Sequence, residues 1–265
     1  ASLGLDVDDD STVTSLTVAH TTPVSIASGK TLSGAITVTA GSIKLDEAGT
    51  LATSVSMSGG TLDADESSTV SGALTQLADI TIDVATGKTL TYSGAAVNLG
   101  ASNTLTLSGG GTLANANDIV LNGTGSKLLL NSITVDSVST SIYSLGLDVD
   151  ANSTVTALSV GHTTPVSIAT GKTLSGAITV SAGSLKLNET GTLASTIAMS
   201  GGILDADESS TVSGALTQSG NIEIDVATGK TLTYSGASLS LDNNTLTLSG
   251  GGTLSNTNAF VLNNA

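Results

Sequence analysis

The stretch that decides the fold is residues 31–51, TLSGAITVTAGSIKLDEAGTL, which begins and ends on a threonine followed by a leucine. Between the two pairs, apolar residues alternate with polar ones in short bursts, as at Ile36 and Val38. Alternation with period two over a few residues is typical of short β-strands with one buried face. Gly41 and Gly49 stand between the bursts, where glycine lets the backbone turn at low steric cost. The stretch therefore predicts short strands separated by frequent turns.

The pair of a small polar and an aliphatic residue recurs along the chain at a nearly constant spacing. The intervals are 19, 19, 19, 20, 23, 20 and 22 residues, and no stretch carries a sustained helical period. A repeat of this length, made of strands and turns, is best built as a β-solenoid with one turn of the solenoid per repeat. A pair of β-sandwiches is the alternative, but it leaves the spacing unexplained. The pairs are Thr12-Val13, Thr31-Leu32, Thr50-Leu51, Thr69-Val70, Thr89-Leu90, Thr112-Leu113, Ser132-Ile133 and Thr154-Val155.

A longer repeat encloses seven of the short ones. Residues 3–8, LGLDVD, return as residues 145–150, an offset of 142 positions. About three quarters of the positions in residues 3–99 are identical to their partners. Identity this high indicates a tandem duplication, with residues 1–142 as a first copy of seven turns and residues 143–265 as an incomplete second copy.

We therefore expect an all-β fold: one continuous parallel β-solenoid over residues 1–265, with about 13 turns of 19–23 residues and no helical cap. Aliphatic residues of successive turns should stack into ladders inside it, so that stability is approximately a sum over neighbouring turns. The sequence starts and stops inside the repetitive pattern, at Ala1 and Ala265. This predicts either continuation in a longer repeat array or self-association end to end, because an open turn exposes unpaired backbone groups.

Composition narrows the classes of partner. The chain has 7 Lys plus Arg against 22 Asp plus Glu, a net charge of -15, which repels phosphate and makes nucleic acid an unexpected partner. The absence of cysteine excludes disulfides and thiolate metal sites. No apolar run approaches the roughly 18 residues of a membrane span, so no span is expected.

Two acidic turns are candidates for a metal site. Each turn has oxygen-bearing side chains on alternate residues, as at the start of a calcium loop. However, Ser11 and Ser153 stand where a calcium loop usually has glycine, and Thr17 and Ser159 stand where it has a bidentate glutamate. We therefore expect at most weak, millimolar-range Ca²⁺ binding, and a solvated acidic turn is the alternative. The oxygen ligands on alternate residues are Asp6, Asp8 and Asp10, and in the second copy Asp148, Asp150 and Asn152.

A second kind of acidic turn raises the question of catalysis. Asp63, Asp65 and Glu66 return 142 positions later, beginning at Asp205. Paired carboxylates perform glycoside hydrolysis, so a polysaccharide-acting enzyme that uses Asp63 or Asp205 is one alternative. Recurrence of each cluster suits a repeated surface better than a single active site. We expect a protein that is not an enzyme, without catalytic or cofactor-binding residues.

With its short turns, its richness in Gly, Ser, Thr and Asn, its acidity and its lack of cysteine, the whole chain resembles the repetitive passenger regions of bacterial surface proteins. These are the autotransporter adhesins and the filamentous-haemagglutinin-like exoproteins. The likeness rests on pattern, because no diagnostic motif of either family is present. It implies a right-handed parallel β-helix at the cell surface or outside the cell. It also implies a non-enzymatic stalk, filament or adhesin role, with a host glycan or surface protein as target. A calcium- or glycan-binding surface module is the alternative.

Overall fold

The computed structural model describes residues 4–140 and 144–262, and every regular element in these ranges is a β-strand. The strands of successive turns pair in parallel, and the fold is a parallel β-solenoid of about 13 turns, which confirms the predicted fold class. The chain divides into two compact units, residues 1–137 and 138–265. The part of the chain that the structure describes contains no helix able to span a membrane.

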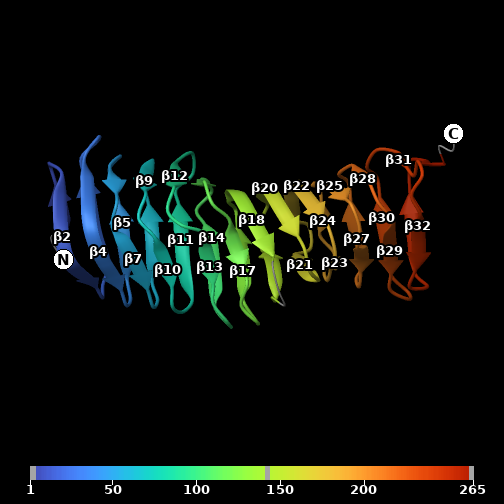
Figure 1. The fold of residues 1–265 in the computed structure, drawn as a ribbon, viewed down its shortest axis with the longest axis horizontal. Helices are drawn as coiled ribbons and strands as arrows, with labels where there is room; N and C mark the ends of the chain where they lie inside the picture. The colour runs from blue at the N-terminus through green and yellow to red at the C-terminus, as the bar shows by residue number, and fades with distance from the viewer. Residues whose placement is uncertain (1–3, 141–143, 263–265) are drawn as a thin grey trace. The chain divides into compact units, whose positions relative to one another are not determined.

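Unit 1 stacks its strands in three columns, and strands of neighbouring turns lie side by side (Figure 1). The first column contains β1 (Leu5–Val7), β3 (Thr22–Ile26), β5 (Ser42–Leu45), β8 (Thr61–Ala64), β11 (Ile80–Val84), β14 (Thr104–Ser108) and β17 (Lys127–Asn131). The second contains β6 (Thr50–Leu51), β9 (Ser68–Val70), β12 (Thr89–Tyr92), β15 (Thr112–Asn115) and the start of β18 (Thr134–Thr140). The third contains β7 (Ser54–Met57), β10 (Leu74–Gln76), β13 (Val97–Leu99) and β16 (Ile119–Leu121). Two long strands serve both the second and third columns, β2 (Ser11–Val18) and β4 (Thr31–Val38).

Unit 2 repeats this arrangement. Its first column contains β19 (Gly146–Val149), β21 (Thr164–Ile168), β23 (Ser184–Leu187), β26 (Ile203–Ala206), β29 (Ile222–Val226) and β32 (Leu246–Ser249). The second contains β24 (Thr192–Leu193), β27 (Ser210–Val212), β30 (Thr231–Tyr234) and β33 (Thr253–Asn256). The third contains β25 (Thr196–Met199), β28 (Leu216–Gln218), β31 (Leu239–Ser240) and β34 (Phe260–Val261). The long strands are β20 (Ser153–Val160) and β22 (Thr173–Val180).

The interior of each unit consists of aliphatic ladders, as the sequence predicts. In unit 1 the register places Leu32, Leu51 and Val70 directly over one another, and all three are completely buried. Burying such a side chain stabilises the fold by about 1.5–3 kcal/mol. Because each turn contacts its neighbours through these ladders and through backbone hydrogen bonds, folding of one turn supports the next.

A buried tyrosine closes the corner between the second and third columns. The hydroxyl of Tyr92 accepts a hydrogen bond from the backbone N–H of Leu74 at 3.1 Å and donates one to the carbonyl of Ala95 at 2.7 Å. Tyr234 makes the same pair of contacts in unit 2. The tyrosine therefore satisfies backbone groups that the strand ladders leave open.

Candidate functional site

The turns predicted to bind calcium lie at equivalent positions in the two units. Oδ1 of Asp10 accepts a hydrogen bond from the backbone N–H of Thr31, on the following turn, at 2.9 Å. Its counterpart Asn152 accepts the equivalent bond from Thr173 at 3.0 Å. An acid and an amide thus perform the same task, which is to cap the next strand.

The other predicted ligands are spread along these turns. Asp6 and Asp148 lie on the first-column strands β1 and β19, and Asp8 and Asp150 are exposed. Asp9, outside the predicted set, pairs with Lys30 at 2.7 Å. Among the described residues, no group of three or more His, Asp or Glu side chains is arranged to hold a metal ion. Binding of Ca²⁺ to these turns stays a prediction.

The second kind of acidic turn forms lysine-bridged clusters. In unit 1, Nζ of Lys44 lies 3.5 Å from a carboxylate oxygen of Asp63 and also contacts Asp65. On the neighbouring turn Lys88 pairs with Glu66 at 2.6 Å. Lys44 and Asp63 share one register position on β5 and β8. We call these five residues the acid–lysine cluster of unit 1.

Unit 2 repeats the acid–lysine cluster with similar geometry. Nζ of Lys186 lies 3.1 Å from Asp205 and 2.6 Å from Asp207. Lys230 pairs with Glu208 at 2.6 Å, the distance found for its counterpart in unit 1. The sequence predicts solvated lysines in the Gly-Lys-Thr turns at Lys88 and Lys230, and their pairing with the acidic turns was not predicted. The signal was present, because Lys44 precedes Asp63 by 19 residues, which is one turn.

Burial shifts the pKa of one aspartate in each cluster. Removal from water raises the pKa of the Asp63 carboxyl, and the charge of Lys44 opposes this effect. Burial likewise raises the pKa of Asp205, opposed by the hydrogen bond from Lys186. The hydrogen bond that the Lys44 ammonium donates to Asp65 raises the pKa of Lys44. Each cluster therefore pairs an aspartate whose pKa is raised by burial with a lysine whose pKa is raised by its carboxylate partners.

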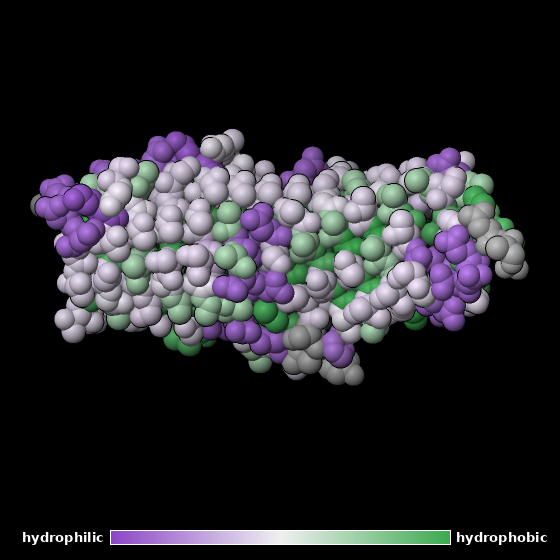
Figure 2. Space-filling model, turned by 45° about the horizontal axis from the view of Figure 1, so that its top comes forward, coloured by the Kyte–Doolittle hydropathy of each residue, from purple (hydrophilic) through white to green (hydrophobic). Residues whose placement is uncertain are grey.

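Charge is unevenly distributed over the columns of strands. In unit 2 all strands of the second and third columns, including β20 and β22, lack Asp, Glu and Lys, whereas the first column carries them on β19, β23, β26 and β29. Most outward positions of the uncharged columns hold Thr, Ser or Ala. Figure 2 shows a face dominated by residues of intermediate hydropathy, with strongly hydrophilic residues in separate patches.

A shallow depression of about 340 Å³ interrupts this uncharged surface of unit 2. Ala198 lies at its centre, between Thr179 and Thr217 on the neighbouring turns, and the buried Met199 lies beneath. Ser200, Gln218 and Ser219 complete the lining. In unit 1 the position of Ser219 is held by the exposed Leu77. The depression offers hydroxyl groups around an apolar floor.

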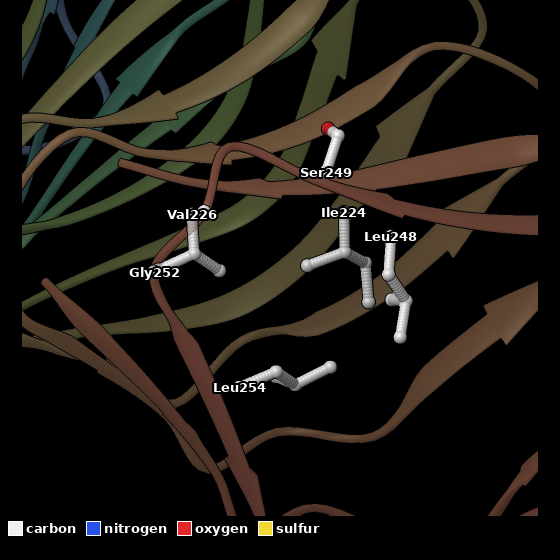
Figure 3. Close-up of a pocket in the computed structure, with 7 residues that line it drawn as sticks. Ile224, Val226, Leu248, Ser249, Gly252 and Leu254 are labelled. Atoms are coloured by element: carbon white, nitrogen blue, oxygen red, sulfur yellow. The ribbon is translucent and has the colours of Figure 1, made fainter. Parts of the chain in front are cut away.

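In the last described turn of unit 2, leucine side chains that are buried in other turns are exposed. Leu248 on β32 is 56% exposed, and Leu246 and Leu254 are partly exposed. A hollow of about 360 Å³ lies among Ile224, Val226, Leu248, Ser249, Gly251, Gly252 and Leu254. Figure 3 shows the side chains of Ile224, Leu248 and Leu254 directed into the same space.

Comparison of the chain with protein families, with curated proteins and with solved structures finds no match.

Proposed function

We propose that this protein is a non-enzymatic structural protein, a stiff β-solenoid segment of a stalk or filament at a bacterial cell surface. The observation that supports the proposal is that recurring polar side chains join one turn to the next, in both units. Asp10 and Asn152 cap a following strand, and Lys44 and Lys186 bridge neighbouring turns. Contacts that recur at equivalent positions of both units and join neighbouring turns suit an extended array, whose stability is a sum over neighbouring turns.

The backbone hydrogen bonds run in the direction in which the turns stack. Backbone bonds between parallel strands connect each turn with the turns on either side, as in the register of β5 with β8 and of β8 with β11. Pulling along the direction of stacking must break the bonds of a whole turn together with its buried aliphatic contacts. Such an array resists extension and proteolysis because few backbone groups open singly.

Force spectroscopy on the full chain tests this proposal. We expect unfolding in repeated steps whose contour length corresponds to whole turns, about 3.5 Å per residue released. Substituting Leu51→Ala, in a buried ladder, should lower the force of one step, while Leu77→Ala, at an exposed position, should leave the forces unchanged. Smooth extension at low force without steps would contradict the proposal.

Assembly and location need separate measurements. Negative-stain electron microscopy over a range of concentrations, with and without Ca²⁺, separates filaments formed end to end from isolated particles. Immunogold labelling of the cells that make the protein tests the surface location, for which labelling confined to the cell interior is the contradicting result.

A glycan-binding surface module is the second candidate, favoured by the hydroxyl-lined depression around Ala198. Threonine and serine hydroxyls bind sugar hydroxyls, and the exposed methyl group of Ala198 would face the apolar side of a sugar ring. Ala198→Gln should abolish binding on a glycan array, while Ser56→Gln at the equivalent position of unit 1 should not. Absence of any bound glycan would remove this candidate.

A further inference from the structure

The hydroxyl-lined depression of unit 2 has an apolar floor between two polar walls. Ala198 is exposed at the floor, and the register places Thr179 and Thr217 beside it, one turn away on either side. Since neighbouring parallel strands lie about 4.8 Å apart, the backbones of the two threonines are about 9.6 Å apart. They leave room for one small ring or substituent, with a methyl group beneath it and a hydroxyl group on each side.

The charge around the depression selects a neutral occupant. None of its lining residues is charged, and the strands of the second and third columns in unit 2 contain no Asp, Glu or Lys. The chain as a whole has a net charge of -15. A sugar with a carboxylate or sulfate group would therefore be repelled by the field of the protein and would meet no cation at the site.

The side-chain amide of Gln218, which lines the depression, has incomplete hydrogen bonding. Its Nε2 donates to the carbonyl of Leu241 at 3.4 Å, a long and therefore weak hydrogen bond. Its Oε1 is buried and has no partner within the part of the chain that the structure describes. A buried acceptor without a donor destabilises a protein, so a ligand that donates a hydrogen bond to Oε1 gains affinity.

In unit 1 the equivalent glutamine is held more firmly. Nε2 of Gln76 donates to the carbonyl of Thr104 at 2.8 Å, and Gln76 is only 6% exposed. Gln218 is partly exposed, and its weaker hydrogen bond lets the amide turn towards the depression. Unit 1 also has Ser56 where unit 2 has Ala198. An exposed methyl floor and a loosely held amide therefore occur together in unit 2.

We propose that this depression binds the acetamido group of a neutral N-acetylated sugar. The methyl of the acetamido group packs on Ala198, its N–H donates to Oε1 of Gln218, and its carbonyl accepts from the hydroxyl of Thr179 or Thr217. The inference deepens the glycan-binding candidate, on which it rests, by naming the class of sugar.

An acetamido group matches the depression better than a sugar hydroxyl does. It combines a methyl group with an N–H donor, whereas a hydroxyl offers a donor without apolar surface. The volume of about 340 Å³ is near the lower end of the roughly 300–1,000 Å³ typical of small-molecule sites. The depression therefore holds one sugar residue, and the rest of a longer glycan lies over the uncharged surface.

The test is an NMR titration of the full chain with two matched pairs of neutral sugars. The N-acetylglucosamine tetramer and cellotetraose differ only in carrying an acetamido group in place of a hydroxyl, as do the methyl glycosides of N-acetylgalactosamine and galactose. We expect at least one N-acetylated sugar to bind, at least tenfold more tightly than its hydroxyl counterpart. Binding of neither N-acetylated sugar, or equal binding within both pairs, overturns the proposal.

Gln218→Met distinguishes recognition of the acetamido group from binding of the sugar ring. Met199 occupies the neighbouring register position, so methionine fits at residue 218. The variant should bind the N-acetylated sugar as weakly as its hydroxyl counterpart and should leave binding of the hydroxyl sugar unchanged. Gln76→Met, in unit 1, is the matched control and should bind like the wild type. A preference that persists in Gln218→Met, in a chain with unchanged circular dichroism, overturns the proposal.

The same panel distinguishes failure of this inference from failure of the glycan-binding candidate. Equal binding within a pair that Ala198→Gln abolishes leaves a glycan site without preference for acetamido groups. Binding that survives Ala198→Gln places the site elsewhere, and binding of no sugar removes both proposals. Stepwise unfolding under force is independent of all these results, so the structural role stands or falls separately.

Discussion

The carbonyl oxygen of Val13 lies so close to Gly34 that a Cβ atom on residue 34 would be 1.7 Å from it. Gly34 has a φ angle of +118°, and the register of β2 and β4 shifts immediately after the Val13 and Gly34 pair. The same relationship recurs between Val155 and Gly176, at 1.8 Å. Glycine is required here because the backbones of two turns meet where the second column passes into the third.

Gly34→Ala is therefore expected to destabilise the protein by about 3 kcal/mol or more, since a main-chain carbonyl must move to accept the methyl group. Gly29→Ala is the control, because Gly29 also has positive φ, +76°, but nothing lies within 4 Å of the added atom. Its expected cost is about 1–2 kcal/mol, from backbone strain alone. Urea denaturation measures both, and equal losses would contradict the steric explanation.

Leu62→Ala should cost about 2–5 kcal/mol, because Leu62 is buried in the ladder between Ile43 and Ile82 and the neighbouring turns cannot collapse into the space. Leu204→Ala, its counterpart in unit 2, should cost a similar amount. Leu77→Ala, at a 60% exposed leucine, should change stability by less than about 0.5 kcal/mol. Comparable losses at Leu62 and Leu77 would show that the ladder is not the source of stability.

The raised pKa of Asp63 predicts an unusual dependence of stability on pH. The folded protein holds the proton of this carboxyl more tightly than the unfolded chain, whose aspartate pKa is about 3.9. The free energy of unfolding of the wild type, relative to that of Asp63→Asn, should therefore fall as the pH rises through the pKa of Asp63 in the folded protein. At pH values below the pKa of Asp63 in the unfolded chain, this loss of stability should be absent.

Urea denaturation of wild type and Asp63→Asn at pH 3 and pH 7 gives this difference. Asp205→Asn should behave in the same way, because burial also raises the pKa of Asp205. A gain of wild-type stability relative to both variants at the higher pH would mean that attraction to Lys44 and Lys186 outweighs burial.

The variant Asp10→Asn distinguishes two roles of Asp10, capping of the next strand and binding of calcium. Asn152 makes the equivalent cap with an amide oxygen, so Asp10→Asn should preserve stability, while Asp10→Ala should cost about 1 kcal/mol through the lost hydrogen bond to Thr31. Thermal denaturation with and without millimolar Ca²⁺ provides the measurement. Stabilisation of the wild type by Ca²⁺ that Asp10→Asn removes would support the calcium prediction instead.

The sequence determined the class of fold because a solenoid is specified locally. The 19-residue spacing of pairs such as Thr31-Leu32 and Thr50-Leu51 reports which residues stack, since equal intervals bring equivalent positions into register in a parallel array. The same spacing of 19 residues separates Lys44 from Asp63, which share one register position in the structure. The repeat spacing therefore predicts which apolar side chains stack. Applied to polar residues, the same spacing also predicts which charged side chains lie on neighbouring turns.

Only the tertiary structure decided features that depend on neighbours on either side of a turn. The hydroxyl of Tyr92, for example, accepts a hydrogen bond from the N–H of Leu74 on the preceding turn, at a separation of 18 residues that differs from the repeat spacing. Likewise, only the structure shows that Oδ1 of Asp10 accepts a hydrogen bond from the backbone N–H of Thr31 on the following turn. The physical reason is that burial and hydrogen bonding belong to pairs of turns, and a sequence pattern describes one turn at a time.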